Sequence, residues 1–317
     1  MNMPNSRIVV TLLLAMLLGA CTEAQDLRTT DAERAKPIKR YDISQSLAAN
    51  GTVVVAGTQS GAVVVSADQG KTWSREVLGP VSMIGLAACP DGSFVGIDFN
   101  HKVWSADARG TGWKSIALEK PRIPLTIICD AKAQWHIGGS RAIIAKSADR
   151  GASWQVTDMG EDAQITALDM VDAQVGIALG EFGLVAATED GGATWKKGAR
   201  IGGEFYPYST VFMNRKEGYA SGIAGTILRT QDGGNTWNKI ENAAQAPLYR
   251  LFLHEGKPYG VGGGGIVARL EGNAFQPMPY PDVAPVFLGA GAALPGQAAI
   301  AIGGPGGLVR VISTQVN

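Results

Sequence analysis

Five aspartates occupy the same place in copies of one motif, Ser/Thr-x-Asp-x-Gly-x-Thr/Ser-Trp, with one extra residue in the second copy. An acidic side chain that recurs in this way could act as a general acid or base. The motif also suits a tight turn, because aspartate accepts backbone N–H bonds, glycine supplies a positive φ and tryptophan offers a large apolar anchor. We therefore predict a structural, non-catalytic role for Asp68 and Trp73, Asp107 and Trp113, Asp149 and Trp154, Asp190 and Trp195, and Asp232 and Trp237.

Basic side chains directly precede several of these motif positions and could bind carboxylates of a partner protein. Three consecutive repeats carry arginine at this position, and an earlier repeat carries lysine. The alternative is that these side chains form ion pairs between neighbouring repeats or a solvated strand face. The candidate partner-binding residues are Lys146, Arg229, Arg269 and Arg310.

The motif positions define an internal repeat that must position these residues. The five copies start at residues 66, 105, 147, 188 and 230, so the spacing is 39 to 42 residues, the size of a four-stranded propeller blade. Two weaker copies, at 266–270 and 308–311, give seven units. The sequence therefore predicts an all-β, seven-bladed β-propeller over residues 36–317. Residues 35–42 resemble residues 274–282, a predicted fourth strand, so we expect this N-terminal segment to complete the last blade.

Composition agrees with a β-rich binding protein and excludes one class of partner. Hydrophobic residues make up 45% of the chain, and the 42 glycines fit many tight turns. Lys+Arg and Asp+Glu are equal at 28 each, whereas a nucleic-acid-binding protein normally has a basic excess. The three histidines lie far apart in the sequence, which predicts no metal site, and no motif for a cofactor is present.

The N-terminus has the pattern of a targeting segment. Arg7 precedes an apolar run at residues 8–18, which is too short to span a bilayer. Leu18-Gly19-Ala20-Cys21 then resembles the bacterial lipoprotein signal, which implies a signal peptide over 1–20 and diacylglycerol on Cys21. Thr22 favours sorting to the outer membrane, on the periplasmic side, and residues 21–35 are expected to be a flexible tether. The alternative is an ordinary signal peptide followed by a chance cysteine.

Two further cysteines, Cys89 and Cys129, are 40 residues apart, which is one repeat. They follow the first predicted strand of neighbouring units, and the periplasm permits disulfides. We predict a disulfide between them. Two free thiols are the alternative, because equivalent points on neighbouring blades can lie too far apart for a bridge.

The longer repeat pattern between Val211 and Trp237 resembles the repeat of the photosystem II stability/assembly factor family, and the short motif matches the Asp-box, or bacterial neuraminidase repeat. The resemblance implies an extracytoplasmic, non-catalytic assembly factor with seven blades that binds a membrane protein. It also implies a lipid anchor, as in cyanobacterial members, and an arginine-rich surface patch. In a photosynthetic organism the partner would be a photosystem II precursor; otherwise an envelope transporter or enzyme complex is expected.

Two rival functions remain open at this stage: a glycan-binding or sialidase-like glycosidase propeller, and a purely structural scaffold. Pro121-Arg122-Ile123-Pro124 resembles a sialidase motif, but it follows two Asp-boxes instead of preceding the first. A sialidase would need several arginines converging on the central cavity. The loops opposite the boxes, which are the usual ligand side of a propeller, carry His101, Lys120, Arg122, Arg141, Glu181, Arg200, Glu204, Tyr206 and Tyr208.

Overall fold

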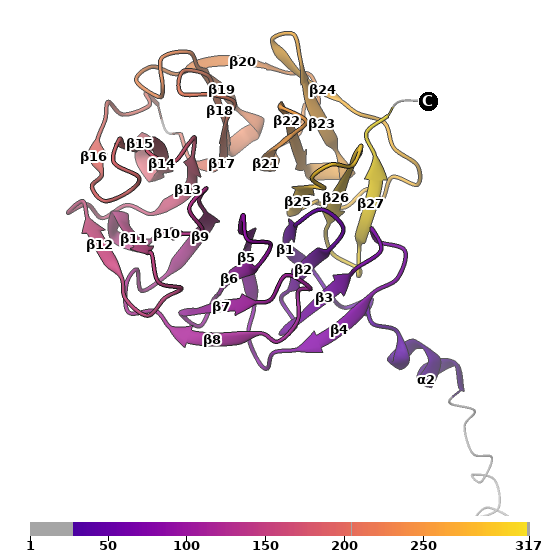
Figure 1. Cartoon of the computed structure of the whole chain (residues 1–317). Coiled ribbons are helices and arrows are strands. Elements are labelled where there is room, and N and C mark those ends of the chain that lie inside the picture. The colour runs from indigo at the N-terminus through magenta and orange to yellow at the C-terminus, as the bar shows by residue number, and fades with distance from the viewer. Residues whose placement is uncertain (1–27, 204, 316–317) are drawn as a thin grey trace, which may run out of the picture. The chain divides into compact units, whose positions relative to one another are not determined.

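The computed structural model describes residues 28–203 and 205–315, and the chain divides into two units between Lys36 and Pro37. The shorter unit contains the helix α2 (Arg28–Ala35). The longer unit is built from short β-strands that follow one another in groups (Figure 1). No helix among the described residues is long and apolar enough to cross a membrane.

The first three groups are antiparallel sheets of four strands each. The first contains β1 (Ser44–Ala49), β2 (Val54–Thr58), β3 (Ala62–Ser66) and β4 (Ser74–Val77). The second contains β5 (Met83–Ala88), β6 (Phe94–Asp98), β7 (Lys102–Ala106) and β8 (Lys114–Ala117). The third contains β9 (Pro124–Cys129), β10 (Trp135–Gly139), β11 (Ile143–Ser147) and β12 (Gln155–Asp158), with the 3-10 turn η1 (Ser140–Ala142).

The remaining groups continue this plan, with two variations. The fourth contains β13 (Ile165–Met170), β14 (Gly176–Gly180), η2 (Glu181–Gly183), β15 (Leu184–Thr188) and β16 (Lys196–Lys197). The fifth contains β17 (Pro207–Phe212), β18 (Gly218–Gly222), η3 (Ile223–Gly225), β19 (Ile227–Thr230) and β20 (Asn238–Asn242). The sixth contains β21 (Leu248–His254), β22 (Lys257–Gly262), η4 (Gly263–Gly265), β23 (Val267–Glu271) and β24 (Ala274–Pro277). The last has only three strands, β25 (Ala290–Ala293), β26 (Ala299–Gly303) and β27 (Val309–Ser313). Parallel pairing of β20 with β24 joins the fifth and sixth groups into one sheet.

The groups form a ring around their first strands. Each first strand adjoins the first strand of the next group, and β25 adjoins β1 (Figure 1). Buried hydrophobic clusters fill the space between each group and the next, and one cluster joins Val64 of β3 to Ala301 of β26 and Val309 of β27. Because second strands such as β2 lie between two such clusters, they are buried along their whole length. The prediction of an all-β propeller is confirmed.

The Asp-box residues hold the turns between the third and fourth strands. In the first group, the Thr72 backbone N–H and hydroxyl donate to the Asp68 carboxylate at 2.8 and 2.5 Å, and the Ser66 hydroxyl donates at 2.8 Å. These bonds lower the pKa of Asp68 to about 2, with the Thr72 hydroxyl as the largest cause. The same bonds recur around Asp149, Asp190 and Asp232. Each of these carboxylates is therefore engaged within its own turn.

The box glycine has a second role that depends on the neighbouring group. Gly70 has a φ of +85°, which favours glycine, and a Cβ there would lie 2.7 Å from the Val311 side chain of the last group. A Cβ on Gly151 would lie 2.0 Å from the Ile116 side chain of the preceding group. The box turns thus pack closely against the preceding group. For Gly70 the preceding group is the last one, so this contact crosses the point where the ring closes.

The predicted closing strand is not formed. Residues 37–43 contain no strand, and the last sheet keeps three strands. Instead, the Gly307 N–H donates to the Asp42 carbonyl at 2.9 Å, and the Ser44 N–H donates to the Gly304 carbonyl at 3.0 Å. Pro37 has no N–H to donate to a ladder. The buried Asp42 carboxylate also accepts bonds from the Lys39 N–H and from Arg75, which bends the segment away from an extended strand.

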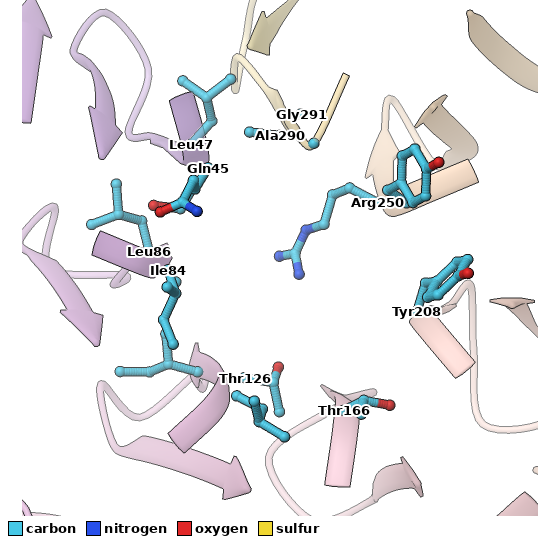
Figure 2. Close-up of a pocket in the computed structure, with 16 residues that line it drawn as sticks. Gln45, Leu47, Ile84, Leu86, Thr126, Thr166, Tyr208, Arg250, Ala290 and Gly291 are labelled. Carbon is cyan, nitrogen blue, oxygen red and sulfur yellow. The ribbon is translucent and has the colours of Figure 1, made fainter. Parts of the chain in front are cut away.

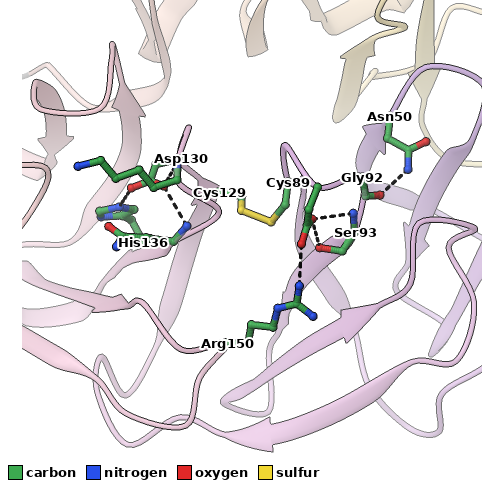
Figure 3. Close-up of a disulfide and its surroundings, with 11 residues drawn as sticks. Asn50, Cys89, Gly92, Ser93, Cys129, Asp130, His136 and Arg150 are labelled. Atoms are coloured by element: carbon green, nitrogen blue, oxygen red, sulfur yellow. Dashed lines mark hydrogen bonds and ion pairs between the residues drawn. A yellow bond between two sulfur atoms is a disulfide. The ribbon is translucent and has the colours of Figure 1, made fainter.

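The structure joins Cys89 and Cys129 in a disulfide, with their Cα atoms 5.2 Å apart (Figure 3). Cys89 directly follows β5, and Cys129 is the last residue of β9. These two first strands belong to neighbouring groups and adjoin near the centre of the ring. Next to this disulfide, the buried His136 Nε2 lies 2.9 Å from the Asp130 carboxylate. Burial raises the pKa of Asp130, but the bonds from His136 and from the Gln134 and Lys132 N–H groups outweigh it and leave the pKa below its usual value. This histidine therefore has a structural contact inside the fold.

Part of the predicted flexible tether is helical. Residues 21–35 show no apolar periodicity, yet α2 forms over Arg28–Ala35. Asp31 lies in its first turn and Arg34 in its last turn, where their charges complement the helix dipole. The two side chains also lie 3.8 Å apart, at a spacing that places them on one side of the helix. The predicted signal peptide, the lipidation site Cys21 and Thr22 lie outside the described residues.

Candidate docking face and central channel

The four predicted partner-binding residues are engaged by the protein itself. Arg229 forms an ion pair with Glu217 at 2.6 Å and donates to Asn273 of the next group at 2.9 Å. The Lys146 ammonium donates to the Gly191 carbonyl of the next group at 2.7 Å. Arg269 pairs with Glu271 at 2.6 Å, and Arg310 donates to the Asp282 carbonyl at 2.7 Å. Lys146 and Arg229 thus bond to the next group, as the alternative interpretation expects, whereas Arg269 pairs within its own strand β23.

At Arg229, a carboxylate of the protein itself already occupies the guanidinium. The Tyr219 hydroxyl donates to Glu217 at 2.6 Å, and together with Arg229 it holds the pKa of Glu217 below its usual value despite partial burial. The Arg229 guanidinium also lies 6.0 Å from the centre of the Tyr219 ring. A partner carboxylate would therefore have to displace an ionised carboxylate that is already bound.

Exposed apolar side chains gather at the opposite end of the ring. We call this end the mouth face; it consists of the turns between second and third strands and the connections between groups. Phe182 in η2 is 68% exposed, Ile223 in η3 is 50% exposed and Phe287 before β25 is 46% exposed. Of the described exposed large hydrophobic residues, the mouth face carries Tyr41, Phe99, Ile123, Phe182, Ile223, Val283 and Phe287. The box end carries only Met213, and the fourth strands carry Val77, Ile116 and Val156.

Aromatic rings connect this surface to the centre of the ring. The Tyr206 and Tyr208 ring centres are 6.1 Å apart, and those of Tyr208 and Tyr249 are 5.4 Å apart. Tyr249 in turn meets Phe287 edge to face, at 6.5 Å. Tyr206 and Tyr208 were among the loop residues singled out from the sequence, whereas Tyr249 and Phe287 were not. Glu204, predicted on the same face, lies outside the described residues.

The mouth face also carries unpaired positive charge. Arg40, Lys120, Arg122 and Arg141 are exposed there, and none of them makes a hydrogen bond or ion pair with another described residue. Arg200, by contrast, pairs with Glu161 and donates to the Phe182 carbonyl at 3.0 Å. Glu181 accepts a bond from the Gln164 N–H at 2.9 Å. An apolar surface with cationic groups is suited to an anionic segment that also carries apolar side chains.

A central channel opens between the first strands, and Arg250 of β21 extends into it (Figure 2). Gln45, Thr126, Thr166 and Tyr208 line the same part of the channel, whose cavity is about 140 Å³. Arg250 also lines the deeper cavities, where Asp169 of β13 is the only other charged residue. Apart from this one guanidinium and one carboxylate, the described lining of the channel carries uncharged polar and apolar groups.

Asp169 and Arg250 influence one another without direct contact. The Asp169 carboxylate accepts the Phe212 N–H at 2.7 Å but forms no ion pair with Arg250. Burial raises the pKa of Asp169 to about 6, although the Phe212 N–H and the charge of Arg250 oppose the shift. Burial likewise lowers the pKa of Arg250, and the charge of Asp169 opposes that shift.

The arrangement does not match the chemistry of a sialidase. Arg250 is the only arginine on the described channel lining, so the cluster that would hold a substrate carboxylate is not formed. Arg122, in the motif that resembled the sialidase sequence, is exposed on the mouth face. Within the described ranges, no three His, Cys, Asp or Glu side chains are grouped to hold a metal ion.

Arg250 was missed because the sequence reasoning compared only the positions near the box. The ladder registers align it with Ser46, Gly85, Thr126, Ala167, Ser209 and Gly291. All of these residues are small, so Arg250 is the only large side chain at this position of the described first strands. An alignment of the first strands of all repeats would have supplied this signal.

The fold and the box turns define this protein as an Asp-box β-propeller with a central channel. The sequence model of the family described as "Photosynthesis system II assembly factor YCF48" matches residues 146–251. The predicted resemblance to the photosystem II assembly factor-like family is thereby confirmed, in the repeats where the pattern is strongest.

Two solved structures share the fold at low sequence identity. One is described as "YCF48 bound to D1 peptide"; it has a TM-score of 0.70 and 14% identity and covers 88% of this chain and 96% of that chain. The other is "YCF48 from Cyanidioschyzon merolae", with a TM-score of 0.69 and 14% identity, covering 88% of this chain and 98% of that one. A search of curated proteins finds no match.

Proposed function

We propose that this chain is a non-catalytic assembly or scaffold protein that binds a membrane-protein partner at its mouth face. The gathering of exposed apolar and unpaired cationic side chains on that one face is the observation that carries the proposal. Apolar side chains of this size seldom gather on one surface of a soluble protein without a binding role. The structurally similar "YCF48 bound to D1 peptide" shows that a propeller of this kind accepts a peptide.

The proposal includes seven blades, an extracytoplasmic location and a lipid anchor. Seven first strands in the described residues adjoin in a ring, and a hydrophobic cluster lies between each pair of neighbouring groups, which supports seven blades. The cysteine after Leu18-Gly19-Ala20 supports lipidation and periplasmic, outer-membrane localisation. The family match supports an assembly role, since the matched family is named for one. A photosystem II precursor is the partner in a photosynthetic source, and an envelope complex is the partner elsewhere.

Polar substitution of the mouth face should abolish partner capture. We expect the triple variant Phe182→Ser/Ile223→Ser/Phe287→Ser to lose a membrane protein that the wild type captures by crosslinking in solubilised envelopes. The reason is that removing three apolar anchors typically weakens an interface by more than about 100-fold. The measurement is quantitative mass spectrometry of the captured proteins, followed by reciprocal capture with the tagged partner.

A matched control shows whether capture depends on the mouth face or on exposed apolar side chains anywhere on the surface. Val77→Ser/Ile116→Ser/Val156→Ser removes three exposed apolar side chains from fourth strands, and this variant should capture the partner as the wild type does. Equal loss in both variants, or equal retention in both, would place docking elsewhere. If the wild type captures no specific membrane protein, the docking function itself is wrong.

Lipidation is tested separately by Cys21→Ser. We expect this variant to leave the membrane fraction, because the acyl chains that anchor a lipoprotein are attached to that sulfur. Cell fractionation and metabolic labelling with a fatty acid measure the two effects. Continued labelling of Cys21→Ser, or unlabelled wild type, would contradict the proposed anchor while leaving the docking proposal intact.

A further inference from the structure

Arg250 combines two features: its guanidinium has no direct partner among the described residues, and it lines the channel, whereas the unpaired Arg40, Arg122 and Arg141 are exposed on the mouth face. Arg229 and Arg269 each have a carboxylate at 2.6 Å. Arg250 makes no hydrogen bond or ion pair with any described residue, and its half-buried side chain lines the channel. A half-buried guanidinium that faces a cavity and has no carboxylate beside it is available to bind an anion.

Other polar groups around the guanidinium can add hydrogen bonds. The Gln45 side-chain oxygen accepts the Ser82 hydroxyl at 2.6 Å, which leaves its NH₂ group to donate to a ligand. Figure 2 shows Gln45, Thr126 and Arg250 on the lining of one cavity, from three different first strands. The Thr126 hydroxyl donates to no described residue, so it too can bond a ligand.

We propose that the central channel is a binding site for one carboxylate group, held by the Arg250 guanidinium with Gln45 and Thr126 as additional donors. The planar guanidinium fork matches the two oxygens of a carboxylate. The ligand enters from the mouth face, past the touching rings of Tyr208 and Tyr249, which suit an apolar group next to the carboxylate. The site needs no docked protein, so it goes beyond the proposed docking function.

The charge of the channel selects against more highly charged anions, and the cavity near its mouth suits a small one. A cavity of about 140 Å³ near the mouth holds a carboxylate with a short chain, since a water molecule occupies about 30 Å³ in the liquid. Only one cation faces the ligand, and Asp169 contributes a negative charge nearby. A phosphate dianion would meet stronger repulsion from Asp169 than a singly charged carboxylate does.

The test is calorimetric titration of the full chain with acetate and benzoate, against chloride at constant ionic strength. We expect Arg250→Gln to weaken carboxylate binding at least about tenfold, since it removes a charge-assisted bidentate contact. Arg250→Lys keeps the charge but loses the fork, and it should weaken binding by a smaller factor. Arg109→Gln is the control, because Arg109 is highly exposed in a box turn at the other end of the ring, and binding should not change.

The pH dependence gives a second readout that a structural role would not produce. The ionisable groups facing Arg250 are Asp169 and the phenols of Tyr208 and Tyr249. With the pKa of Asp169 raised to about 6, this carboxyl is charged at pH 7.5 and neutral at pH 5. Carboxylate binding should therefore strengthen roughly threefold to tenfold between pH 7.5 and 5. Asp169→Asn should remove this dependence and bind as tightly at both pH values.

A pair of peptides distinguishes two sources of the carboxylate, a peptide C-terminus and a small free acid. A short apolar peptide with a free C-terminus and the same peptide with a C-terminal amide are titrated alongside acetate. Tighter binding of the free acid, lost in Arg250→Gln, supports the proposal with a peptide terminus as ligand. Binding of acetate or benzoate alone supports it with a small free acid. The proposal is overturned if no carboxylate binds, or if binding is unchanged in both Arg250→Gln and Arg250→Lys.

Discussion

The double variant Cys89→Ser/Cys129→Ser is expected to unfold with a free energy about 2–4 kcal/mol lower than that of the wild type. The disulfide links residues 40 apart in sequence, so it restricts a long loop of the unfolded chain. It also ties the first strands of two neighbouring groups at the centre of the ring. Chemical denaturation of both proteins in a Cys21→Ser background, without reductant, measures the difference.

Reduction provides an internal control for this prediction. A thiol reductant should lower the stability of the wild type to that of the double variant and leave the double variant unchanged. Mass spectrometry after alkylation should find no free thiol at either position in the untreated protein. Two alkylated cysteines in purified protein, or wild-type stability that is insensitive to the reductant, would show that the bridge is absent.

Asp42→Ala is expected to lower the free energy of unfolding by about 3–5 kcal/mol. The Asp42 carboxylate is buried and accepts bonds from Arg75 at 2.7 and 3.2 Å, from the Ser60 hydroxyl at 2.6 Å and from the Lys39 N–H at 2.8 Å. Removing the carboxylate leaves the Arg75 guanidinium, whose side chain is only 14% exposed, without its counter-charge. Denaturant unfolding compared with the wild type gives the magnitude.

Hydrogen exchange in Asp42→Ala shows whether the variant loses stability at the ring closure or throughout the fold. Hydrogen exchange should become faster at the Gly307 and Ser44 amides, which bond across the closure, before it does so in β13 to β16. Glu271→Ala is the matched control, because it also removes a carboxylate from an arginine, but the pair is partly exposed, and its loss should cost less than about 1 kcal/mol. Similar losses in both variants, or unchanged exchange at Gly307, would mean that Asp42 does not hold the ring closed.

The two proposed binding regions are suited to different ligands. The mouth face offers side chains such as Phe182 and Ile223 on separate turns, which suits a protein surface or an extended segment. The channel offers one guanidinium in a narrow cavity, which suits a single anionic group. Tyr249 and Phe287 join the two regions, so a ligand in the channel would lie directly beneath a docked partner.

The sequence by itself determined the all-β repeat and the role of the boxes. Each box is local: Asp68 binds Thr72, four residues away, and Gly70 adopts its positive φ within the same turn. Interactions of this range are encoded in every copy of the repeat, so spacing and residue type were sufficient to predict them. The same holds for the family resemblance, which is strongest where the copies are most regular.

Tertiary structure decided which distant residues meet, and there the sequence was insufficient. Residues 35–42 had the composition of a closing strand, but Arg75 and Ser60 bind Asp42 and hold that segment out of the last sheet. For Arg229, Arg269 and Arg310 the sequence left partner binding and ion pairing within the protein both open, and in the folded protein Glu217, Glu271 and the Asp282 carbonyl bind them. Arg250 lies in the channel because the first strands of the described groups enclose a common axis. The contacts at Asp42 and around the channel join residues far apart in the sequence, and a periodic sequence does not specify the distances between them.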